Sequence, residues 1–266
     1  MAGGGGDQGA PVDRAPSVTP LELWDMLVQG QPLQHYRWEP SFPRMLAAVV
    51  EGLRTGALER DVGAQARELG RHIDTVYLTG GDAGAQLVAP LVDLGLTVNL
   101  AEDPVFAAVR AGWELAPPPI DLCADLGQTS IKLFDGRRTW RIERDRTRAP
   151  ILGQDDDRGD ARRSTLEFIA DALTTDGSPS RLLLALPCEI DEEQAPSACT
   201  YCWHDPDPSW RSELADRLGI ATRDLRLIND AELAALAASR ELGPRPKPAL
   251  VLTIGFGVGA AILGPS

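Results

Sequence analysis

Two glycine-rich loops stand at the ends of apolar segments in this chain of 266 residues. The first is Asp-Leu-Gly-Gln-Thr at Asp125–Thr129, and the second is Thr-Ile-Gly-Phe-Gly-Val-Gly at Thr253–Gly259. Glycine leaves the backbone N–H groups of such a loop accessible, so they can surround phosphate oxygens. Two loops of this kind predict two halves of a protein that hold one polyphosphate between them. If either loop is considered alone, an ordinary tight turn without a phosphate-binding role explains its glycines equally well.

Phosphoryl transfer needs positioned phosphates, a metal ion that bridges them, and a base for the acceptor proton. Asp125 is a candidate Mg²⁺ ligand, directly or through water. Lys132 is expected to face the nucleotide or to be solvated. The candidate phosphate-binding residues, from the two loops together, are Asp125, Gly127, Gln128, Thr129, Lys132, Thr253, Gly255, Gly257 and Gly259.

Composition limits the classes of function. The net charge of −13 argues against non-specific binding to nucleic acid or to an anionic membrane. No apolar run approaches the roughly 20 residues that span a bilayer. The four cysteines lack the spacing of a disulfide framework, which favours a reducing cytoplasm. Cys199 and Cys202, with His204 and Cys188, form at most half of a zinc motif, so reduced structural thiols are the default expectation.

Apolar periodicity predicts an α/β chain. Residues 1–18 are expected to be a disordered tail, and the acidic segment Pro150–Asp160 a loop. Ser164 is the expected N-cap of its helix. Helices are expected at Leu21–Val28, Pro43–Leu53, Val62–Leu69, Ala83–Leu94, Pro104–Gly112, Ser164–Leu173, Ser209–Leu218 and Ala231–Leu242. Strands are expected at Asp74–Leu78, Thr97–Leu100, Asp121–Asp125, Ser130–Phe134, Thr139–Ile142, Arg181–Leu186 and Leu225–Ile228, and a final hairpin at Ala249–Leu263.

Four segments together resemble the bacterial ROK-type sugar kinases and, more broadly, the actin, hexokinase and heat-shock ATPase superfamily. They are DLGQTSIK at Asp125–Lys132, LALPCEID at Leu184–Asp191, INDAELAALAA at Ile228–Ala238 and TIGFGVGAAI at Thr253–Ile262. The resemblance implies a two-lobed, actin-like or ribonuclease-H-like ATPase fold with mixed sheets, and ATP and Mg²⁺ as cofactors.

The same resemblance implies roles for three further residues. Asp230 is the base that takes a proton from a sugar hydroxyl, and Asn229 hydrogen-bonds the sugar. An Asn/Asp helix N-cap is the alternative for this pair. Asp191 is a candidate for positioning substrate, metal or water, with an exposed loop carboxylate as the alternative.

A third glycine loop, LTGGDAG at Leu78–Gly84, lacks the Gly-x-Gly-x-x-Gly spacing of a dinucleotide-binding loop. It resembles the loop that cups adenosine late in superfamily chains, which assigns adenosine contacts to Gly80, Gly81, Asp82 and Ala83. Its early position suggests a circular permutation. One lobe is then expected at residues 117–247, and the other at 19–116 plus 248–266, with proline-rich joints where the chain crosses between them.

The chain departs from the kinase pattern after the second phosphate loop. Neither Glu-x-Gly-His nor a cysteine-rich zinc motif follows it, and LQHYRWEP at Leu33–Pro40 has a His and a Glu at the wrong spacing. The leading expectation is an ATP-dependent phosphotransferase acting on a small sugar-like hydroxyl compound. An actin-like or chaperone-like ATPase that binds protein partners or self-associates is the second, and a non-catalytic ligand sensor is the third.

Overall fold

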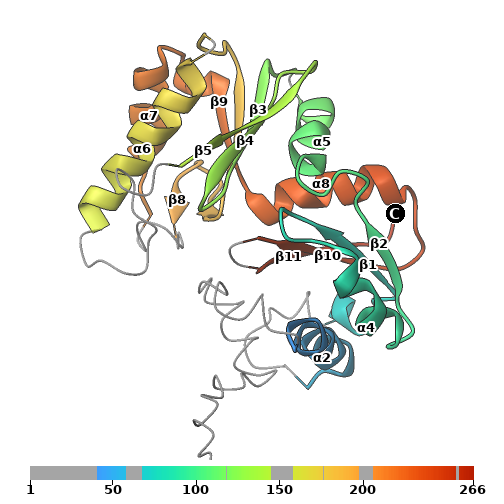
Figure 1. Cartoon of the computed structure of the whole chain (residues 1–266). Helices are drawn as coiled ribbons and strands as arrows, with labels where there is room; N and C mark the ends of the chain where they lie inside the picture. Colours follow the sequence, from blue (N-terminus) through green and yellow to red (C-terminus); the bar gives the residue numbers. More distant parts are fainter. Residues whose placement is uncertain are drawn as a thin grey trace, which may run out of the picture.

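The structure, a computed structural model, describes residues 41–57, 68–117, 119–144, 158–175, 177–197, 206–255 and 258–266. Two β-sheets form its framework (Figure 1). The expected tail at residues 1–18 and the expected helix at Leu21–Val28 lie outside the described residues, as does most of the one at Val62–Leu69.

The five-stranded sheet has the order β5-β4-β3-β6-β9. An antiparallel meander supplies three of its strands, and β6 and β9 extend it in parallel on the other side of β3. β6 is apolar throughout and buried at every residue, as a strand covered on both faces must be. The strands are β3 (Leu122–Leu126), β4 (Ser130–Phe134), β5 (Thr139–Glu143), β6 (Leu182–Leu186) and β9 (Leu225–Asn229).

The four-stranded sheet has the order β11-β10-β1-β2, and it joins strands from both ends of the described chain. β10 and β11 form an antiparallel hairpin, while β1 and β2 run parallel to β10. The strands are β1 (Thr75–Thr79), β2 (Thr97–Leu100), β10 (Ala249–Ile254) and β11 (Val258–Leu263). The predicted α/β class with mixed sheets is confirmed, whereas the lobe boundaries and the circular permutation stay predictions.

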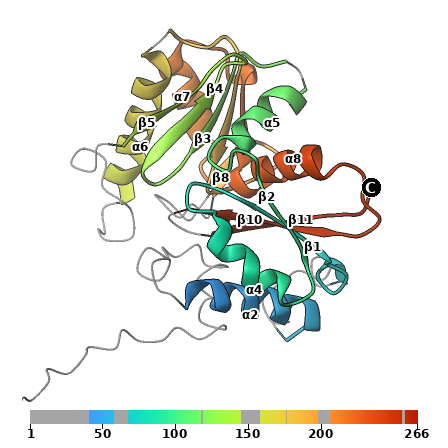
Figure 2. The same ribbon diagram turned by 45° about the vertical axis from the view of Figure 1, so that its right-hand side comes forward.

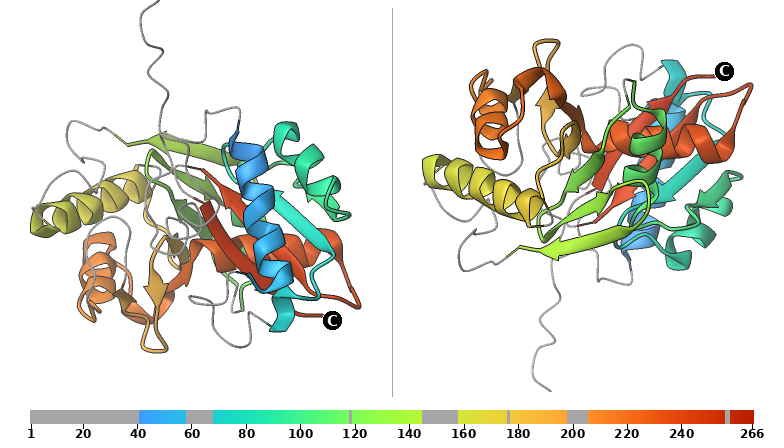
Figure 3. Two further views of the ribbon diagram at one scale, coloured as in Figure 1. Left: turned by 90° about the horizontal axis from the view of Figure 1, so that it is seen from below. Right: turned by 90° about the horizontal axis from the view of Figure 1, so that it is seen from above.

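Helices cover the outer face of each sheet. α6 (Arg158–Thr174) and α7 (Trp210–Leu218) pack on the five-stranded sheet, where Leu166, Ile169 and Leu214 enter its core. α2 (Phe42–Thr55) lies across the four-stranded sheet, as the view from below shows (Figure 3). Its buried residues share a core with strands β1, β10 and β11 and with α4 (Val88–Val92), which follows the 3-10 turn Ala85–Leu87.

Two helices lie between the sheets: α5 (Ala107–Leu115) and α8 (Asp230–Leu242) (Figures 1 and 2). One core beside them joins Tyr77 and Val251 of the four-stranded sheet to alanines of both helices. Another joins Val109 and Leu233 of the helices to Leu183 of the five-stranded sheet. This helix pair therefore connects the two sheets.

Expectations about elements were wrong at two places, and two further features were missed. α6 begins at Arg158, so the final residues of the expected loop Pro150–Asp160 are helical and Ser164 lies inside the helix rather than at its cap. The single helix expected at Ala83–Leu94 is a 3-10 turn followed by a five-residue helix. The small hairpin of β7 (Glu189–Ile190) and β8 (Pro196–Ser197), and the 3-10 turn Thr222–Asp224, were not predicted.

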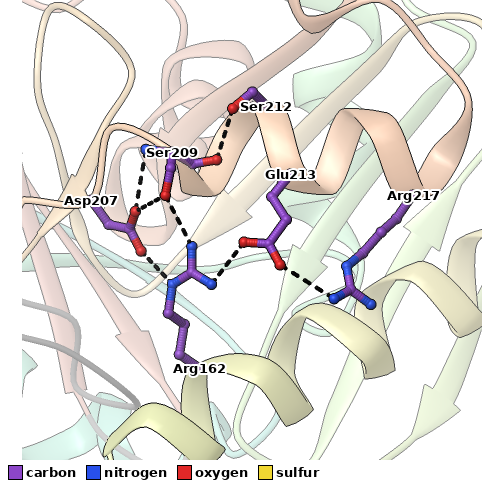
Figure 4. Close-up of polar contacts among 6 residues, drawn as sticks. All are labelled: Arg162, Asp207, Ser209, Ser212, Glu213 and Arg217. Atoms are coloured by element: carbon purple, nitrogen blue, oxygen red, sulfur yellow. Dashed lines mark hydrogen bonds and ion pairs between the residues drawn. The ribbon is translucent and has the colours of Figure 1, made fainter.

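A polar cluster holds α6 against α7 (Figure 4). The Arg162 guanidinium pairs with Asp207, donates to Glu213 at 2.8 Å, and lies 3.3 Å from the Ser209 hydroxyl. Although burial alone would raise the pKa of Asp207, hydrogen bonds from Arg162 and Ser209 lower it below its usual range. Because the pKa of Asp207 is lowered, its pairing with Arg162 stabilises the fold at pH values above the ordinary aspartate pKa. This contribution is lost as the pH falls through the pKa of Asp207 in the folded protein.

We predict that Arg162→Ala lowers the free energy of unfolding at pH 7 by about 2 kcal/mol, because it leaves the largely buried Asp207 carboxylate without its charged partner and leaves Glu213 with Arg217 alone. Urea unfolding should show this loss shrinking as the pH is lowered toward 3. Arg223→Ala is the control, since Arg223 is 88% exposed and lies 4.0 Å from Asp224. Equal losses for both variants, or a loss that does not change with pH, would contradict the assignment.

Candidate functional site

The carboxyl ends of parallel strands gather the candidate residues. β3, β6 and β9 are parallel, so Asp125 at the end of β3 and Asn229 at the end of β9 lie at the same edge of the five-stranded sheet. β1 and β10 are also parallel, with Thr79 opposite Thr253. Ligands of α/β sheets bind outside these carboxyl ends.

Asp125 forms a salt bridge with Lys132. The two residues lie opposite each other on β3 and β4, and the Lys132 Nζ is 2.7 Å from the Asp125 Oδ2. Their side chains are only 13% and 17% exposed, so Lys132 is not simply a solvated surface lysine. The Asp125 carboxylate is a suitable ligand for a hard cation such as Mg²⁺, and the Lys132 ammonium group can bind a phosphate. Both residues lie beside the first loop.

The first loop closes on itself. The Gly127 N–H, which we expected to face a phosphate, donates to the Ser130 carbonyl at 2.8 Å. The Thr129 carbonyl accepts from the Arg144 N–H at 2.7 Å, and the Thr129 side chain is half-buried. Gln128 is 6% exposed, and its buried Oε1 accepts no hydrogen bond from the part of the chain that the structure describes. An unsatisfied buried acceptor is costly, which makes Gln128 a group that a bound donor would stabilise.

Asn229, not Asp230, caps α8. Its Oδ1 accepts from the N–H groups of Ala231 at 2.9 Å and Glu232 at 3.3 Å, and its Nδ2 donates to the Cys188 carbonyl at 2.9 Å. The N-cap alternative thus describes Asn229, whose amide is engaged within the protein. Asp230 is the first residue of the helix, and its Oδ1 accepts from the Ala231 N–H at 2.8 Å.

Asp230 has the electrostatic properties of a proton acceptor. Burial raises the pKa of its carboxyl group from 3.8 to about 7, the charge of Asp125 adds to the rise, and the Ala231 N–H and Lys132 oppose it. Asp230 therefore lies within electrostatic reach of the Asp125–Lys132 pair. A carboxyl group with a pKa near neutrality suits general acid–base chemistry.

The second loop lies beside the start of α8. Gly259 faces Thr253 across the β10–β11 hairpin, and its N–H donates to the Thr253 Oγ1 at 3.1 Å. A Cβ added at Gly259 would lie 2.4 Å from that oxygen and 3.6 Å from the Ala231 Cβ. The hairpin thus approaches the helix turn that carries Asp230. Gly255 is described, and Gly257 lies outside the described residues.

The Gly80–Ala83 turn touches the second loop. The Asp82 N–H donates to the Ile254 carbonyl at 2.9 Å, and Ala83 closes the turn onto the Gly80 carbonyl at 3.2 Å. Gly80 has φ +105°, and a Cβ there would lie 2.3 Å from the Ile254 carbonyl oxygen. Only glycine fits this contact. Gly81 has open space around it.

Asp191 lies in the turn between β7 and β8. Its Oδ1 accepts from the Ala195 N–H at 2.7 Å, and the residue is exposed. The neighbouring Gln194 reaches β9, where its Oε1 accepts from the Leu227 N–H at 2.7 Å. In the structure Asp191 acts as a turn-forming carboxylate, and its role toward a substrate stays a prediction.

The cysteines differ in part from expectation. Cys123 is a buried free thiol, whereas Cys188 is disulfide-bonded, which contradicts a fully reduced set. Cys199, Cys202 and His204 lie outside the described residues, as does His35. Within the described ranges no group of three or more His, Cys, Asp or Glu side chains is arranged to hold a metal. No helix in those ranges is both long and apolar enough to cross a membrane.

Two contributions to the site were missed from the sequence. The Cys188 carbonyl fixes the Asn229 amide, and the Arg144 N–H fixes the first loop at Thr129. Both act through the backbone, so no residue type marks them. Lys132, by contrast, could have been paired with Asp125 from the hairpin register.

Comparison with solved structures finds a partial match to a sugar kinase. The polyphosphate/ATP-glucomannokinase of Arthrobacter sp. strain KM is 21% identical, with a TM-score of 0.38. The match covers 55% of this chain and 58% of the kinase chain, so this chain matches little more than half of that kinase's length. No protein-family model and no curated protein matches the chain. This level of similarity does not assign the chain to a family.

We predict that Gly80→Ala lowers the free energy of unfolding by about 2 kcal/mol or more. The new methyl group would clash with the Ile254 carbonyl oxygen, and alanine is strained at the positive φ of residue 80. Gly81→Ala is the matched control and should change the stability by less than about 0.5 kcal/mol. Thermal or urea unfolding of the two variants makes the comparison. Equal stability of both would show that the contact between the two loops is absent in solution.

We also predict that Asp230→Asn stabilises the protein at alkaline pH. The pKa of the Asp230 carboxyl group is higher in the folded state than in the unfolded state, so protonation of this group stabilises the fold. This stabilisation is fully present below about pH 4 and is lost as the pH rises through about 7. Asparagine does not ionise, so the variant should exceed the wild type in free energy of unfolding at pH 8 by an amount on the order of 3 kcal/mol. Below pH 4 the two should converge. Urea unfolding without divalent cations tests this, and equal stabilities at pH 8 would refute a raised pKa.

Proposed function

We propose that this chain is an ATP-dependent phosphotransferase that transfers the terminal phosphoryl group to an alcohol, with Asp230 as the base. The observation that carries the proposal is the position of Asp230 at the first turn of α8, with a pKa near 7, beside the Asp125–Lys132 pair and the β10–β11 hairpin. A base and two phosphate loops in one place are what such a transfer requires.

The residues fit Mg²⁺ and ATP. Mg²⁺ in nucleotide sites is held by one or two carboxylates together with phosphate oxygens, and Asp125 is a carboxylate of this kind at a strand end. Lys132 would turn from Asp125 toward the phosphates, and Thr129 and Thr253 supply hydroxyl groups on opposite sides. Gly80–Ala83 would hold the adenosine. The bound metal would neutralise phosphate charge, while the protein aligns the acceptor.

In the transfer, the acceptor hydroxyl gives its proton to the Asp230 carboxylate as its oxygen bonds to the terminal phosphorus and ADP leaves. A raised pKa favours this role, because a base works best when its pKa lies near the operating pH. The sugar-like nature of the acceptor rests on the resemblance of Ile228–Ala238 to the kinase helix that carries this base. Since the Asn229 amide is engaged as a cap, substrate contact through it would use its remaining hydrogen-bonding capacity.

The first experiment is to measure ADP release from Mg-ATP by the purified protein, with and without a pooled panel of sugars and amino sugars. Stimulation by the pool is expected, and dividing the pool then identifies the acceptor. ADP release indifferent to every sugar would contradict the proposal and favour an ATPase switch. Absence of release despite ATP binding would leave a ligand sensor.

We predict that Asp230→Asn lowers kcat by a factor of about 10²–10⁴ while ATP affinity is kept, because only the proton transfer is lost. Glu232→Gln is the matched control: it lies in the same first turn of α8 but is exposed, and it should keep wild-type kcat. In the wild type, kcat/KM should fall below about pH 7 as Asp230 becomes protonated. An unchanged kcat for Asp230→Asn would exclude it as the base.

A further inference from the structure

A cavity of about 140 Å³ opens between the β4–β5 turn and the residues that follow α6. Asp121, which directly precedes β3, lines this cavity, whereas Asp125 lies near the other end of the strand, about 13 Å further along the extended backbone. The cavity is therefore separate from the candidate phosphotransfer site. Proteins leave few internal spaces larger than a water molecule, so a space of this size can hold a ligand.

The floor of the cavity is apolar. Leu122, Leu133 and Leu173 line it, and all three belong to the core under the outer face of the five-stranded sheet. An apolar cavity of about 150 Å³ is large enough to take up benzene. The floor therefore suits an apolar body of roughly six heavy atoms.

Trp140 of β5 forms an aromatic wall, and a cation already lies over its face. The Arg138 guanidinium carbon is 4.6 Å from the centroid of the Trp140 ring, within the range of a cation–π contact. Trp140 lies opposite Leu133 in the β4–β5 pairing, so the aromatic wall adjoins the apolar floor. The stacked guanidinium shows which kind of group this wall attracts.

Two carboxylates at the cavity favour the same kind of group. The Asp135 Oδ1 accepts from the N–H groups of Arg137 and Arg138, both at 2.9 Å. The Asp121 Oδ2 accepts from two backbone N–H groups, at 2.9 and 3.2 Å, and Asp121 forms no ion pair with the described residues. These contacts fix both carboxylates in place. Since Arg138 is the one cation among the residues that line the cavity, the lining has a net negative charge and disfavours an anionic ligand.

The contact of Arg138 with the aromatic wall is easily exchanged. The Arg138 side chain is 57% exposed, and its Nε lies 3.5 Å from the Asp135 Oδ2, so this ion pair contributes little to stability. The turn has other supports. Asp135 holds it through two N–H groups, and a Cβ added at Gly136 would lie 2.4 Å from the Trp113 ring of α5. The Arg138 side chain can therefore leave the Trp140 ring while the turn keeps its shape.

We propose that this cavity binds a small organic cation. The apolar body of the ligand fills the floor, and its ammonium or guanidinium group replaces the Arg138 guanidinium over Trp140, beside Asp121 and Asp135. Arg138 thus occupies the cation position when no ligand is bound. The proposal is independent of the proposed catalytic activity, because the cavity lies at the opposite end of β3.

The test is an NMR titration of the isotope-labelled full-length protein with benzylamine, which joins an aromatic body of this size to one ammonium group. We expect saturable shifts at the Trp140 indole N–H and at the backbone N–H groups of Gly136 and Gly177, with a Kd on the order of 1 mM. Benzyl alcohol has the same shape without the charge, so it should bind at least about 10-fold more weakly.

The decisive variant removes the internal cation. Arg138→Ala should tighten benzylamine binding by roughly 3- to 10-fold, because the ligand no longer competes for the Trp140 ring. Arg137→Ala is the matched control: it removes the same charge from the same turn, but Arg137 is exposed and forms no ring contact with the described residues. It should change the Kd by less than about 2-fold. Asp135→Asn keeps the Oδ1 acceptor of the turn and should weaken binding by about 5-fold.

Three outcomes would overturn the proposal. The first is the absence of saturable shifts at the named N–H groups. The second is equal affinity for benzylamine and benzyl alcohol, which would exclude recognition of a cation. The third is that Arg138→Ala binds benzylamine no more tightly than Arg137→Ala does, since Arg138 would then not occupy the position of the ligand.

Discussion

The close packing of α5 against α8 is the contact on which the rest of the structure depends. At Gly112 of α5, a Cβ would lie 2.5 Å from the Leu233 Cδ1 of α8 and 2.8 Å from the Cys123 Sγ of β3. Alanines on both helices, among them Ala111 and Ala237, continue this contact to the four-stranded sheet. Small side chains let helix backbones approach closely, and a protein core tolerates little added volume. The distance between the two sheets is therefore set by residues that have almost no side chain.

This helix pair also determines where the candidate base lies. α8 begins at Asp230, directly after β9, so its first turn is fixed to the five-stranded sheet by the strand and by the Asn229 cap. Its buried face packs on the hairpin of the other sheet, and Ala231 lies next to Gly259. A single helix thus places the carboxyl group of one half of the site against the phosphate loop of the other half. A shift of α8 along its axis would change both relations together.

The sequence predicted the fold where a pattern was local. The apolar run at Leu182–Leu186, the strand at Thr97–Leu100 and the hairpin at Ala249–Leu263 were all located, because burial on one or both faces leaves a periodic signal. The start of α6 was missed because its first turns are charged, and their contacts, such as that of Arg162 with α7, are made far along the chain. Propensity alone does not contain such tertiary contacts. For the site, the residue types indicated Asp125 and Asp230, but the cap at Asn229 and the Gly80–Ile254 contact became clear from geometry.

The geometry of the loops implies that ligand binding exchanges contacts rather than simply adding them. The N–H groups of Gly127 and Gly259 already donate within the protein, and Lys132 already neutralises Asp125. Because these groups are satisfied, a phosphate gains only the difference between its own hydrogen bonds and those it replaces. Two other groups differ. The buried Gln128 Oε1 accepts no hydrogen bond from the described residues. Burial and the charge of Asp125 raise the pKa of the Asp230 carboxyl group to about 7. The selectivity of this site for its ligand should therefore depend more on ligand donors that reach Gln128 and Asp230 than on the backbone N–H groups of the glycine loops.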